Sequence, residues 1–291
     1  MKIKELFKKG TVFSFEIFPP KRTSPVETIY NTLDELQGLH PDFISVTFGA
    51  GGSANSGRSI EIAEKIHRDL GIESALHLPC INYTKQEIED ILEQLEKHDI
   101  ENILALRGDK SPDIEPKEDF KYASDLISFI KEKSGDRFDI AGACYPEGHI
   151  ETESLVKDVL NLKYKVECGA EHLISQLFFD NESFYSFVER TKIAGIDVPI
   201  EAGIMPVTNK AQIERMVSMC GASLPPKFTK MIQKYEFKPD ALRDAGIAYA
   251  VDQIVDLVSN GVDGIHLYTM NNPYVARRIS EAVENIIRSG N

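Results

Sequence analysis

The feature that most constrains this fold is a regular alternation of strand-like and helix-like segments along the whole sequence. Short apolar runs rich in β-branched and aromatic residues predict buried parallel strands. Between them lie amphipathic segments whose apolar residues recur at helical spacing. The runs that predict strands are residues 11–20, 43–48, 74–78, 102–106, 138–144, 172–179, 198–204 and 264–268.

About eight strand–helix units at this spacing predict an α/β fold of the (β/α)8, or TIM barrel, class. No Ser/Gly-rich linker or shift in composition divides the chain, so we expect one domain over residues 1–291. Residues 220–239 interrupt the rhythm with an extra helical segment. An open doubly wound sheet is the alternative. Its Gly-x-Gly-x-x-Gly fingerprint is missing after the first strand, and the run Gly49-Ala50-Gly51-Gly52 is only a weak signal.

Two helix starts carry a local signature. Ser24 with Glu27, and Thr84 with Glu87, have the spacing of a capping box, in which the first side chain and the acid three residues later bond each other's backbone N–H groups. Helices are therefore expected to begin at both places.

Composition excludes several classes of partner. The net charge is −13, which argues against non-specific nucleic-acid binding and against an anionic membrane surface. No apolar run is long enough to span a membrane, and the first residues lack the apolar stretch of a secretory signal. The four cysteines are widely spaced, so we expect free thiols, no metal site and a cytoplasmic protein.

Polar side chains gather at the predicted carboxyl ends of the strands, where barrels of this class carry their active sites. Glu16 alternates with Phe13, Phe15 and Ile17, and a carboxylate in such a strand is costly without a partner or a function. A solvated Glu on an edge strand is the alternative. The other strand ends provide Thr47, His77, Arg107, Asp109, Tyr145, Glu147, His149, Gln176, His266 and Tyr268. Each has an ordinary structural explanation alone, but together they predict a site.

Asp158, Asn161 and Lys165 form a second feature. They are three and four residues apart, so they lie along one side of a predicted helix, beside its apolar stripe. Spacing alone favours a solvated helix face. The functional alternative is a clamp for a long polar ligand with hydroxyls and phosphates.

A series of motifs resembles those of methylenetetrahydrofolate reductases, in order, over residues from about 10 to 270. The motifs are FEIFPP at 15–20, SVTFGA at 45–50, HLPC at 77–80, ALRGD at 105–109, YPEGH at 145–149, QLFFD at 176–180 and GIMP at 203–206. The resemblance implies a flavin-binding barrel that reduces 5,10-methylenetetrahydrofolate to 5-methyltetrahydrofolate in one-carbon and methionine metabolism. FAD would be the cofactor and NAD(P)H the reductant.

The resemblance also implies roles for individual residues. Glu16 matches the general acid, and its place among Phe side chains is expected to raise its pKa. Asp109 matches the carboxylate beside flavin and folate, and Gln176 matches an amide that binds the pterin. Gln212 and Tyr268 match further substrate-side positions. The positions that match flavin contacts are Thr47, His77, Arg107, Gly108, Asp109, Tyr122, Ala123, Ala143, Tyr145, His149, Asp158, Asn161 and Lys165.

Three positions depart from the family pattern. Met216 stands where an aromatic Phe is usual, Asn272 where an Arg is usual, and Tyr164 where a basic residue is usual. The electron donor is therefore open: NADH, NADPH or a partner protein. The alternative function is a flavin- and folate-binding subunit of a larger electron-transfer complex, and we expect a homo- or hetero-oligomer. A phosphate-binding barrel lyase is a third possibility, but it does not explain why Glu16 and Asp109 would lie at the same mouth of the barrel.

Overall fold

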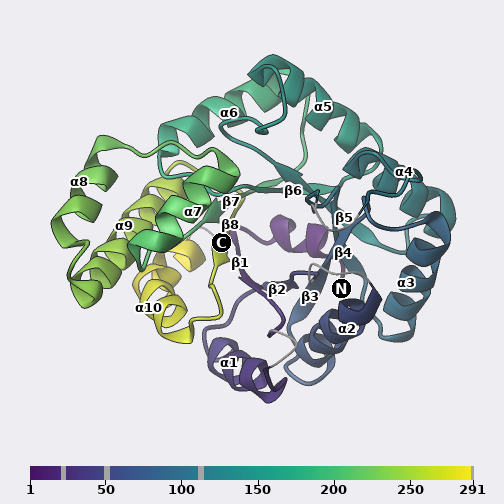
Figure 1. Ribbon diagram of the computed structural model, residues 1–291, viewed down its shortest axis with the longest axis horizontal. Coiled ribbons are helices and arrows are strands. Elements are labelled where there is room, and N and C mark those ends of the chain that lie inside the picture. The colour runs from purple at the N-terminus through teal and green to yellow at the C-terminus, as the bar shows by residue number, and fades with distance from the viewer. Residues whose placement is uncertain (21–23, 49–52, 111–114, 290–291) are drawn as a thin grey trace.

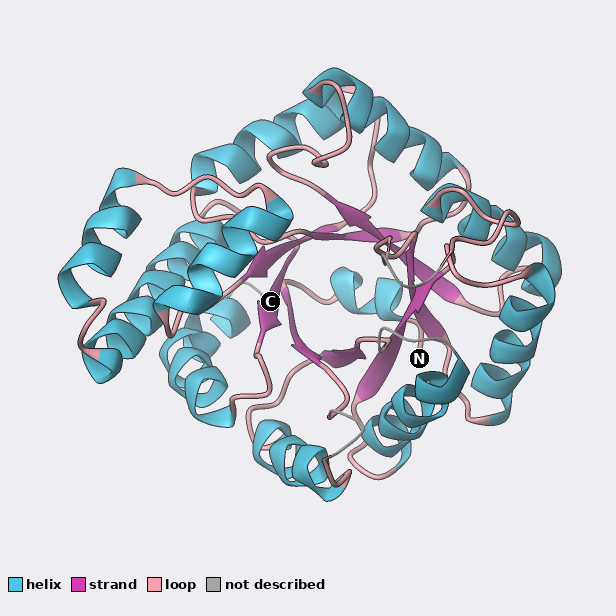
Figure 2. Cartoon of the chain, in the orientation of Figure 1, coloured by secondary structure: helices cyan, strands magenta, loops and turns pink. Residues whose placement is uncertain are grey.

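Eight parallel strands close into one barrel in a computed structural model that describes residues 1–20, 24–48, 53–110 and 115–289. Each strand pairs with its sequence neighbours, and β8 closes the ring on β1. Figure 1 shows the ring and Figure 2 the helices that surround it, so the predicted (β/α)8 barrel is confirmed. The strands are β1 (Val12–Ile17), β2 (Phe43–Val46), β3 (Glu73–Pro79), β4 (Asn102–Leu106), β5 (Asp139–Cys144), β6 (His172–Ser175), β7 (Ile200–Ile204) and β8 (Gly264–Tyr268).

Helices follow the strands along the chain, and the extra segment expected at 220–239 contains one further helix, α8. Its Phe228 ring lies 4.8 Å from the ring of Tyr249 on α9, so α8 packs on the outside of α9. None of the described helices has the length and apolar character needed to cross a membrane. The helices are η1 (Ile3–Lys8), α1 (Glu27–Gln37), α2 (Ser53–Arg68), α3 (Lys85–Lys97), α4 (Ala123–Ser134), α5 (Leu155–Glu167), α6 (Asn181–Ile193), α7 (Lys210–Cys220), α8 (Pro226–Tyr235), α9 (Pro239–Ser259) and α10 (Pro273–Ser289).

Strand β1 shows how the alternation of side chains separates two environments. Phe13, Phe15 and Ile17 are buried in the core between the sheet and the helices. Ser14 and Glu16 face the barrel interior, as the two-residue period of a strand requires. Because β1 pairs with both β2 and β8, the alternative of an exposed edge strand is excluded.

The end of the barrel opposite the site is closed by η1, which the sequence did not predict (Figure 1). Ile3 and Leu6 are buried there in a cluster with Val12 and Phe43 from the strands. The backbone N–H of Ile3 donates to Asn102 Oδ1 at 2.9 Å, which fixes η1 to β4.

Element ends differ from prediction in two places. Strand β6 ends at Ser175 and not at Phe179, because Leu177 and Phe179 pack in a separate cluster with α7 and α8. Helix α1 begins at Glu27 with no side-chain cap, so the capping box expected at Ser24 is wrong. The capping box of Thr84 with Glu87 is confirmed. The run Gly49-Ala50-Gly51-Gly52 lies outside the described residues.

Candidate active site at the mouth of the barrel

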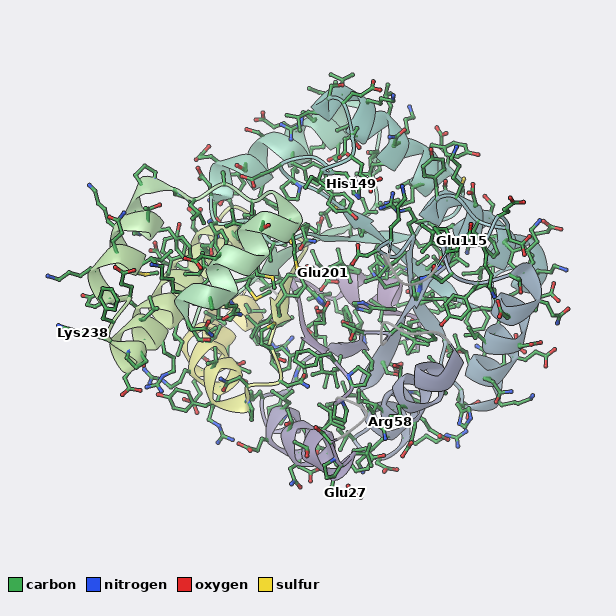
Figure 3. All side chains as sticks on the ribbon, viewed as in Figure 1. Glu27, Arg58, Glu115, His149, Glu201 and Lys238 are labelled. Atoms are coloured by element: carbon green, nitrogen blue, oxygen red, sulfur yellow. The ribbon has the colours of Figure 1, made fainter. Side chains whose placement is uncertain are left out.

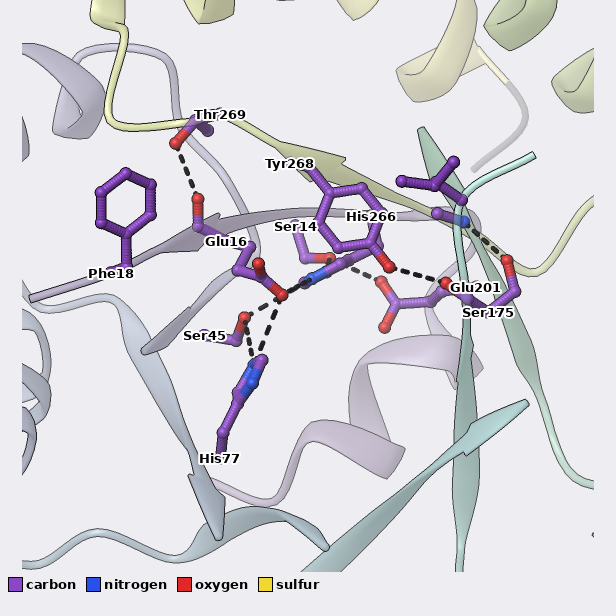
Figure 4. Close-up of polar contacts among 12 residues, drawn as sticks. Ser14, Glu16, Phe18, Ser45, His77, Ser175, Glu201, His266, Tyr268 and Thr269 are labelled. Atoms are coloured by element: carbon purple, nitrogen blue, oxygen red, sulfur yellow. Dashed lines mark hydrogen bonds and ion pairs between the residues drawn. The ribbon is translucent and has the colours of Figure 1, made fainter. Parts of the chain in front are cut away.

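Glu16 lies at the end of β1 between two imidazoles (Figure 4). Its Oε2 atom is 3.6 Å from Nε2 of His77 on β3 and 3.6 Å from Nε2 of His266 on β8. The Glu16 side chain is 20% exposed, whereas that of His266 is fully buried. The carboxylate is therefore open to the mouth on one side and held by histidines on the other.

The expectation that Glu16 has a raised pKa is wrong for this structure. Burial alone raises the pKa, but the contact with His266 and the charges of His77 and His266 outweigh it, and the pKa lies below its usual value. The Phe side chains that suggested an apolar setting point away from Glu16, toward the helices. Burial also lowers the pKa of His77 to about 4, so that this imidazole is neutral near pH 7.

A second buried carboxylate, Glu201, lies near Glu16 inside the barrel (Figure 4). Glu201 on β7 is fully buried, and its Oε1 accepts a hydrogen bond of 2.7 Å from Ser14 Oγ. Ser14 Oγ is also 2.7 Å from Nδ1 of His266. Burial raises the pKa of Glu201 to about 7, against the smaller opposing effects of His266 and Ser14.

A cavity of about 480 Å³ opens at the carboxyl ends of β4 and β5, the end of the barrel that carries Glu16, and lies against α4 and α5. Most of the residues that match flavin-contacting positions line it, drawn from widely separated parts of the chain. They are Arg107, Tyr122, Ala123, Ala143, Tyr145, His149, Asp158, Asn161 and Lys165. Tyr164, one of the three departures from the family pattern, lines the same cavity.

The polar stripe of α5 lines this cavity, with Asp158 buried, Lys165 half-buried and Asn161 exposed. Lys165 Nζ donates to the carbonyl of Ala143 at 2.5 Å. Burial lowers the pKa of Lys165 against the opposing charges of Cys144 and Asp158. Asp158 accepts hydrogen bonds from the backbone N–H of His149 and from Thr152 Oγ1, both at 3.2 Å, and so fixes the loop before α5.

Arg107 stands at the edge of the cavity, where Glu151 binds it through both guanidinium NH groups at 2.5 and 3.0 Å. Gly108 follows with a φ of +88°, and a Cβ there would lie 2.9 Å from Cβ of Pro79. This glycine therefore permits both the turn and the close approach of two strand ends. Asp109, next along the chain, is exposed at the mouth.

Tyr145 and His149 form an aromatic wall of the cavity. Their ring centroids are 4.7 Å apart in an edge-to-face arrangement. Burial raises the pKa of Tyr145 to about 12, so its hydroxyl stays protonated, and burial together with Arg107 lowers the pKa of His149. Both side chains are thus neutral near pH 7, which suits contact with a flat conjugated ring.

A second cavity of about 390 Å³ lies between the ends of β7 and β8, under α7. Gln212, Met216 and Asn272 all line it, so one substrate-side position and two departures from the family pattern meet there. Gln212 Oε1 accepts hydrogen bonds from the N–H of Thr208 at 3.4 Å and from the hydroxyl of Thr208 at 3.1 Å.

The remaining predicted residues lie at the carboxyl ends of other strands of the barrel. Tyr268 donates its hydroxyl to the carbonyl of Ser175 at 2.8 Å. Gln176 is half-buried, and its Oε1 accepts from the N–H of Leu177 at 2.9 Å. Thr47 is half-buried, and its N–H donates to Ile17 at 3.0 Å.

The sequence did not single out three residues that the structure joins to Glu16: Ser14, Ser45 and Glu201. Ser45 Oγ lies 3.1 Å from Nε2 of His77 and 3.5 Å from Nε2 of His266. A usable signal was present for Glu201, since it is a carboxylate within the apolar run 198–204, as Glu16 is within its own strand. No group of three or more His, Cys, Asp or Glu side chains suited to a metal ion occurs within the described ranges.

The larger cavity fits a phosphate-bearing flavin nucleotide. Lys165 is a half-buried cation that a phosphate would stabilise, and the first turn of α4, which carries the partial positive charge of a helix N-terminus, forms part of the wall. Asn161 adds an amide for a hydroxyl-bearing chain.

A family model described as methylenetetrahydrofolate reductase matches residues 2–284. The chain is 39% identical over 258 residues to the 5,10-methylenetetrahydrofolate reductase of Escherichia coli (strain K12), covering 89% of this chain and 86% of that one. It is 35% identical over 284 residues to methylenetetrahydrofolate reductase (NADH) 1 of Arabidopsis thaliana, covering 93% of this chain. It spans about half of the plant protein, 48% of its length.

Among solved structures, a Clostridium thermocellum protein that binds two copies of 5-methyl-5,6,7,8-tetrahydrofolic acid superposes with a TM-score of 0.70. The alignment covers 99% of both chains at 14% sequence identity, so this likeness shows the shared fold. The family match covers nearly the whole chain and agrees with the identity to the bacterial relative, and on these findings the chain belongs to the methylenetetrahydrofolate reductase family.

Proposed function

We propose that this protein is a cytoplasmic, FAD-dependent enzyme that reduces 5,10-methylenetetrahydrofolate to 5-methyltetrahydrofolate, with Glu16 as its general acid. The observation that carries the proposal is the carboxylate of Glu16 between His77 and His266, at a mouth flanked by a cavity suited to a flavin nucleotide. Family membership supplies the reaction class.

The cofactor would be held by the wall of the larger cavity. Lys165 and the N-terminus of α4 would neutralise phosphate, Asn161 and Asp158 would bind hydroxyls, and Tyr145 with His149 would contact the ring. Thr47, His77, Gly108 and Asp109 would border the reactive end. Bound FAD, when reduced, supplies the hydride that the methylene carbon of the substrate accepts.

Glu16 would move the proton of the reaction. Opening of the methylene bridge requires a proton on a folate nitrogen, and a carboxyl at the mouth is placed to donate it. The resulting substrate cation would be stabilised by the carboxylate of Asp109, which is exposed at the same mouth. Gln176 would bind the pterin through its amide, with Gln212 and Tyr268 bordering the substrate.

We assign NADH or NADPH as the first choice of electron donor. A second candidate function rests on Met216 and Asn272, which line the smaller cavity where the family pattern has an aromatic and a basic residue. Without those two groups a partner protein would be the reductant, and the chain would be the flavin- and folate-binding subunit of a hetero-oligomer.

One experiment separates these functions. The purified chain, reconstituted with FAD, is titrated anaerobically with NADH, with NADPH and with 5-methyltetrahydrofolate while its visible absorption is recorded. Bleaching by the folate and by a nicotinamide supports the reductase. Bleaching by the folate alone supports the subunit with a partner donor. Failure to bind FAD at all would contradict both.

A further inference from the structure

A continuous line of polar atoms joins the two carboxylates inside the barrel (Figure 4). It runs from Glu201 Oε1 to Ser14 Oγ over 2.7 Å, and from Ser14 Oγ to His266 Nδ1 over 2.7 Å. It then passes from His266 Nε2 to Glu16 Oε2 over 3.6 Å. Ser14 and His266 are neighbours on paired strands, so the barrel itself fixes the middle of this line.

Glu201 is unusual because nothing in the chemistry described above uses it. It is fully buried, and among the described residues its Oε2 has no hydrogen-bond partner. An ionised carboxylate with an unsatisfied oxygen in this setting is strongly unfavourable, whereas a protonated carboxyl is tolerated. The space for Glu201 is made by Gly264, where a Cβ would lie 2.7 Å from Cγ of Glu201.

The groups around Glu201 come from several elements. His266 on β8 and Ser14 on β1 favour its ionised form, whereas Asp42, before β2, and Asp263, before β8, oppose it. Both aspartates have partners of their own, because Arg288 binds Asp42 at 3.0 Å and the N–H of Ile200 donates to Asp263 at 2.9 Å. The surroundings of Glu201 therefore keep its proton near neutral pH.

Glu16 presents the opposite case. The histidines beside it lower its pKa, so at pH values up to about 7 the unliganded protein holds a proton more readily at Glu201 than at Glu16. A general acid must nevertheless be protonated when the substrate is bound and the mouth is covered.

We propose that Glu201, Ser14 and His266 form a proton-transfer chain that protonates Glu16 from inside the barrel. The inference rests on the proposed role of Glu16 as the general acid. Ser14, His266 and Glu201 act through Glu16 and are positioning and relay residues.

The transfer balances with no external reactant. Before it, Glu201 donates to Ser14 Oγ, Ser14 donates to His266 Nδ1, and His266 Nε2–H faces Glu16. Each bond passes one proton onward, so Glu201 becomes the carboxylate and Glu16 the acid. Afterwards His266 Nδ1–H donates to Ser14 Oγ, and the Ser14 hydroxyl, which can rotate, donates to Glu201 Oε1. The relay requires the 3.6 Å step between His266 and Glu16 to shorten when ligand covers the mouth, as catalytic contacts often do in complexes.

The test uses the FAD-loaded full chain and follows each half-reaction by anaerobic stopped flow from about pH 5 to pH 9. The variants are Ser14→Ala, which cuts the chain, and Glu201→Gln, which removes its proton source. The matched control is His172→Gln, another buried side chain, on β6, whose ring nitrogens make no hydrogen bond to any described residue. We expect both relay variants to slow folate reduction by roughly tenfold to hundredfold and to flatten its pH profile between about pH 6 and pH 8.

The oxidation of NADH by the flavin is expected to stay within about twofold in both relay variants, because that half-reaction does not use the proton of Glu16. The control is expected to match the wild type in both half-reactions. Unchanged folate rates and pH profiles in Ser14→Ala and Glu201→Gln would overturn the relay. If Glu16→Gln itself left folate reduction unchanged, the role of Glu16 would fall, which is a distinct outcome.

A spectroscopic measurement keeps the proposal testable if a variant loses activity for other reasons. The infrared C=O stretch of a protonated carboxyl is recorded for the unliganded protein near pH 6, in the wild type and in Glu201→Gln. We expect the band in the wild type and a weaker band in the variant, because burial also raises the pKa of Asp139 to about 7 and that carboxyl keeps its own band. A wild type without this band, or a variant that retains it in full, would refute Glu201 as the proton store.

Discussion

Oε2 of Glu16 lies 3.6 Å from Nε2 of His266, so one imidazole joins the carboxylate at the mouth to the buried carboxylate below it. Strand pairing produces this relationship. Ser14 pairs with His266 and Glu16 pairs with Tyr268, so the imidazole lies one layer below the mouth. The rings of Phe43 and His266 are stacked, with their centroids 6.1 Å apart. Three predictions concern the barrel interior and the flavin cavity, and two concern the reaction.

Glu201 is expected to make the protein less stable as the pH rises. Its pKa is raised from 4.5 to about 7, so the folded state binds more protons than the unfolded state in that window. Unfolding free energy therefore falls as pH rises from about 4.5 to about 7, by up to about 3 kcal/mol. The measurement is urea unfolding of the wild type and of Glu201→Gln at a series of pH values.

The comparison with Glu201→Gln is needed because two histidines act in the opposite direction. The pKa of His77 is lowered to about 4 and that of His172 to about 3, so their contribution is lost as pH falls below about 6.5. Both remain in the variant, and subtraction removes them. A difference curve that is flat between pH 4.5 and pH 8 would contradict the raised pKa of Glu201.

Gly264→Ala is expected to destabilise the barrel by about 1–3 kcal/mol, because the added methyl would press on Cγ of Glu201 at 2.7 Å and on the carbonyl of Val12 at 3.1 Å. Urea unfolding measures the effect. The matched control is Gly57→Ala on α2, where an added Cβ meets nothing within 4 Å. Alanine is the better helix former there, so we expect a gain of about 0.5–1 kcal/mol. Equal effects at the two sites would contradict the crowding at Glu201.

Lys165→Met is expected to weaken FAD binding by roughly tenfold to hundredfold, because it removes a partly buried cation from the cavity wall. Fluorescence titration of FAD with the flavin-free protein measures the affinity. Lys157→Met is the control, since Lys157 lines the same cavity but is 55% exposed and pairs with Glu153 at 3.0 Å. We expect less than about a threefold change there. Similar losses in both variants would show that only the total charge matters.

Asp109→Asn is expected to retain FAD but to slow folate reduction by roughly tenfold to hundredfold, since the substrate cation loses its facing carboxylate. Glu115→Gln, an exposed acid further along the same connection, is the control for charge alone (Figure 3). Stopped-flow rates of the two half-reactions measure the effect. If only FAD affinity changed, Asp109 would be a structural contact of the cofactor.

The fold could be predicted because the spacing of apolar residues, every second residue in strands and every three to four in helices, can be read from short stretches of sequence. The alternation of Ser14 and Glu16 with Phe13 and Phe15 identified which face of β1 is apolar, and the structure agrees. Prediction failed where contacts with an element far along the chain determine the local structure. The apolar run after Ser175 reads as strand, yet Leu177 packs with α7 and α8, which come later in the chain.

The same limit applied to the site. The stripe of Asp158, Asn161 and Lys165 was visible in the sequence, but only the structure shows that it faces a cavity. The pKa of Glu16 was predicted in the wrong direction, because the imidazoles of His77 and His266 reach it from β3 and β8. No local pattern brings those strands together; the closure of the barrel does.

The most direct test of the account is the anaerobic rate at which methylenetetrahydrofolate reoxidises the reduced flavin in the wild type and in Glu16→Gln. We predict that the variant binds FAD and is reduced by NADH as the wild type is. We also predict that its folate half-reaction is slowed by roughly a hundredfold to ten-thousandfold, as expected for loss of a general acid. An unchanged folate rate in a variant that binds FAD normally would contradict the central role of Glu16.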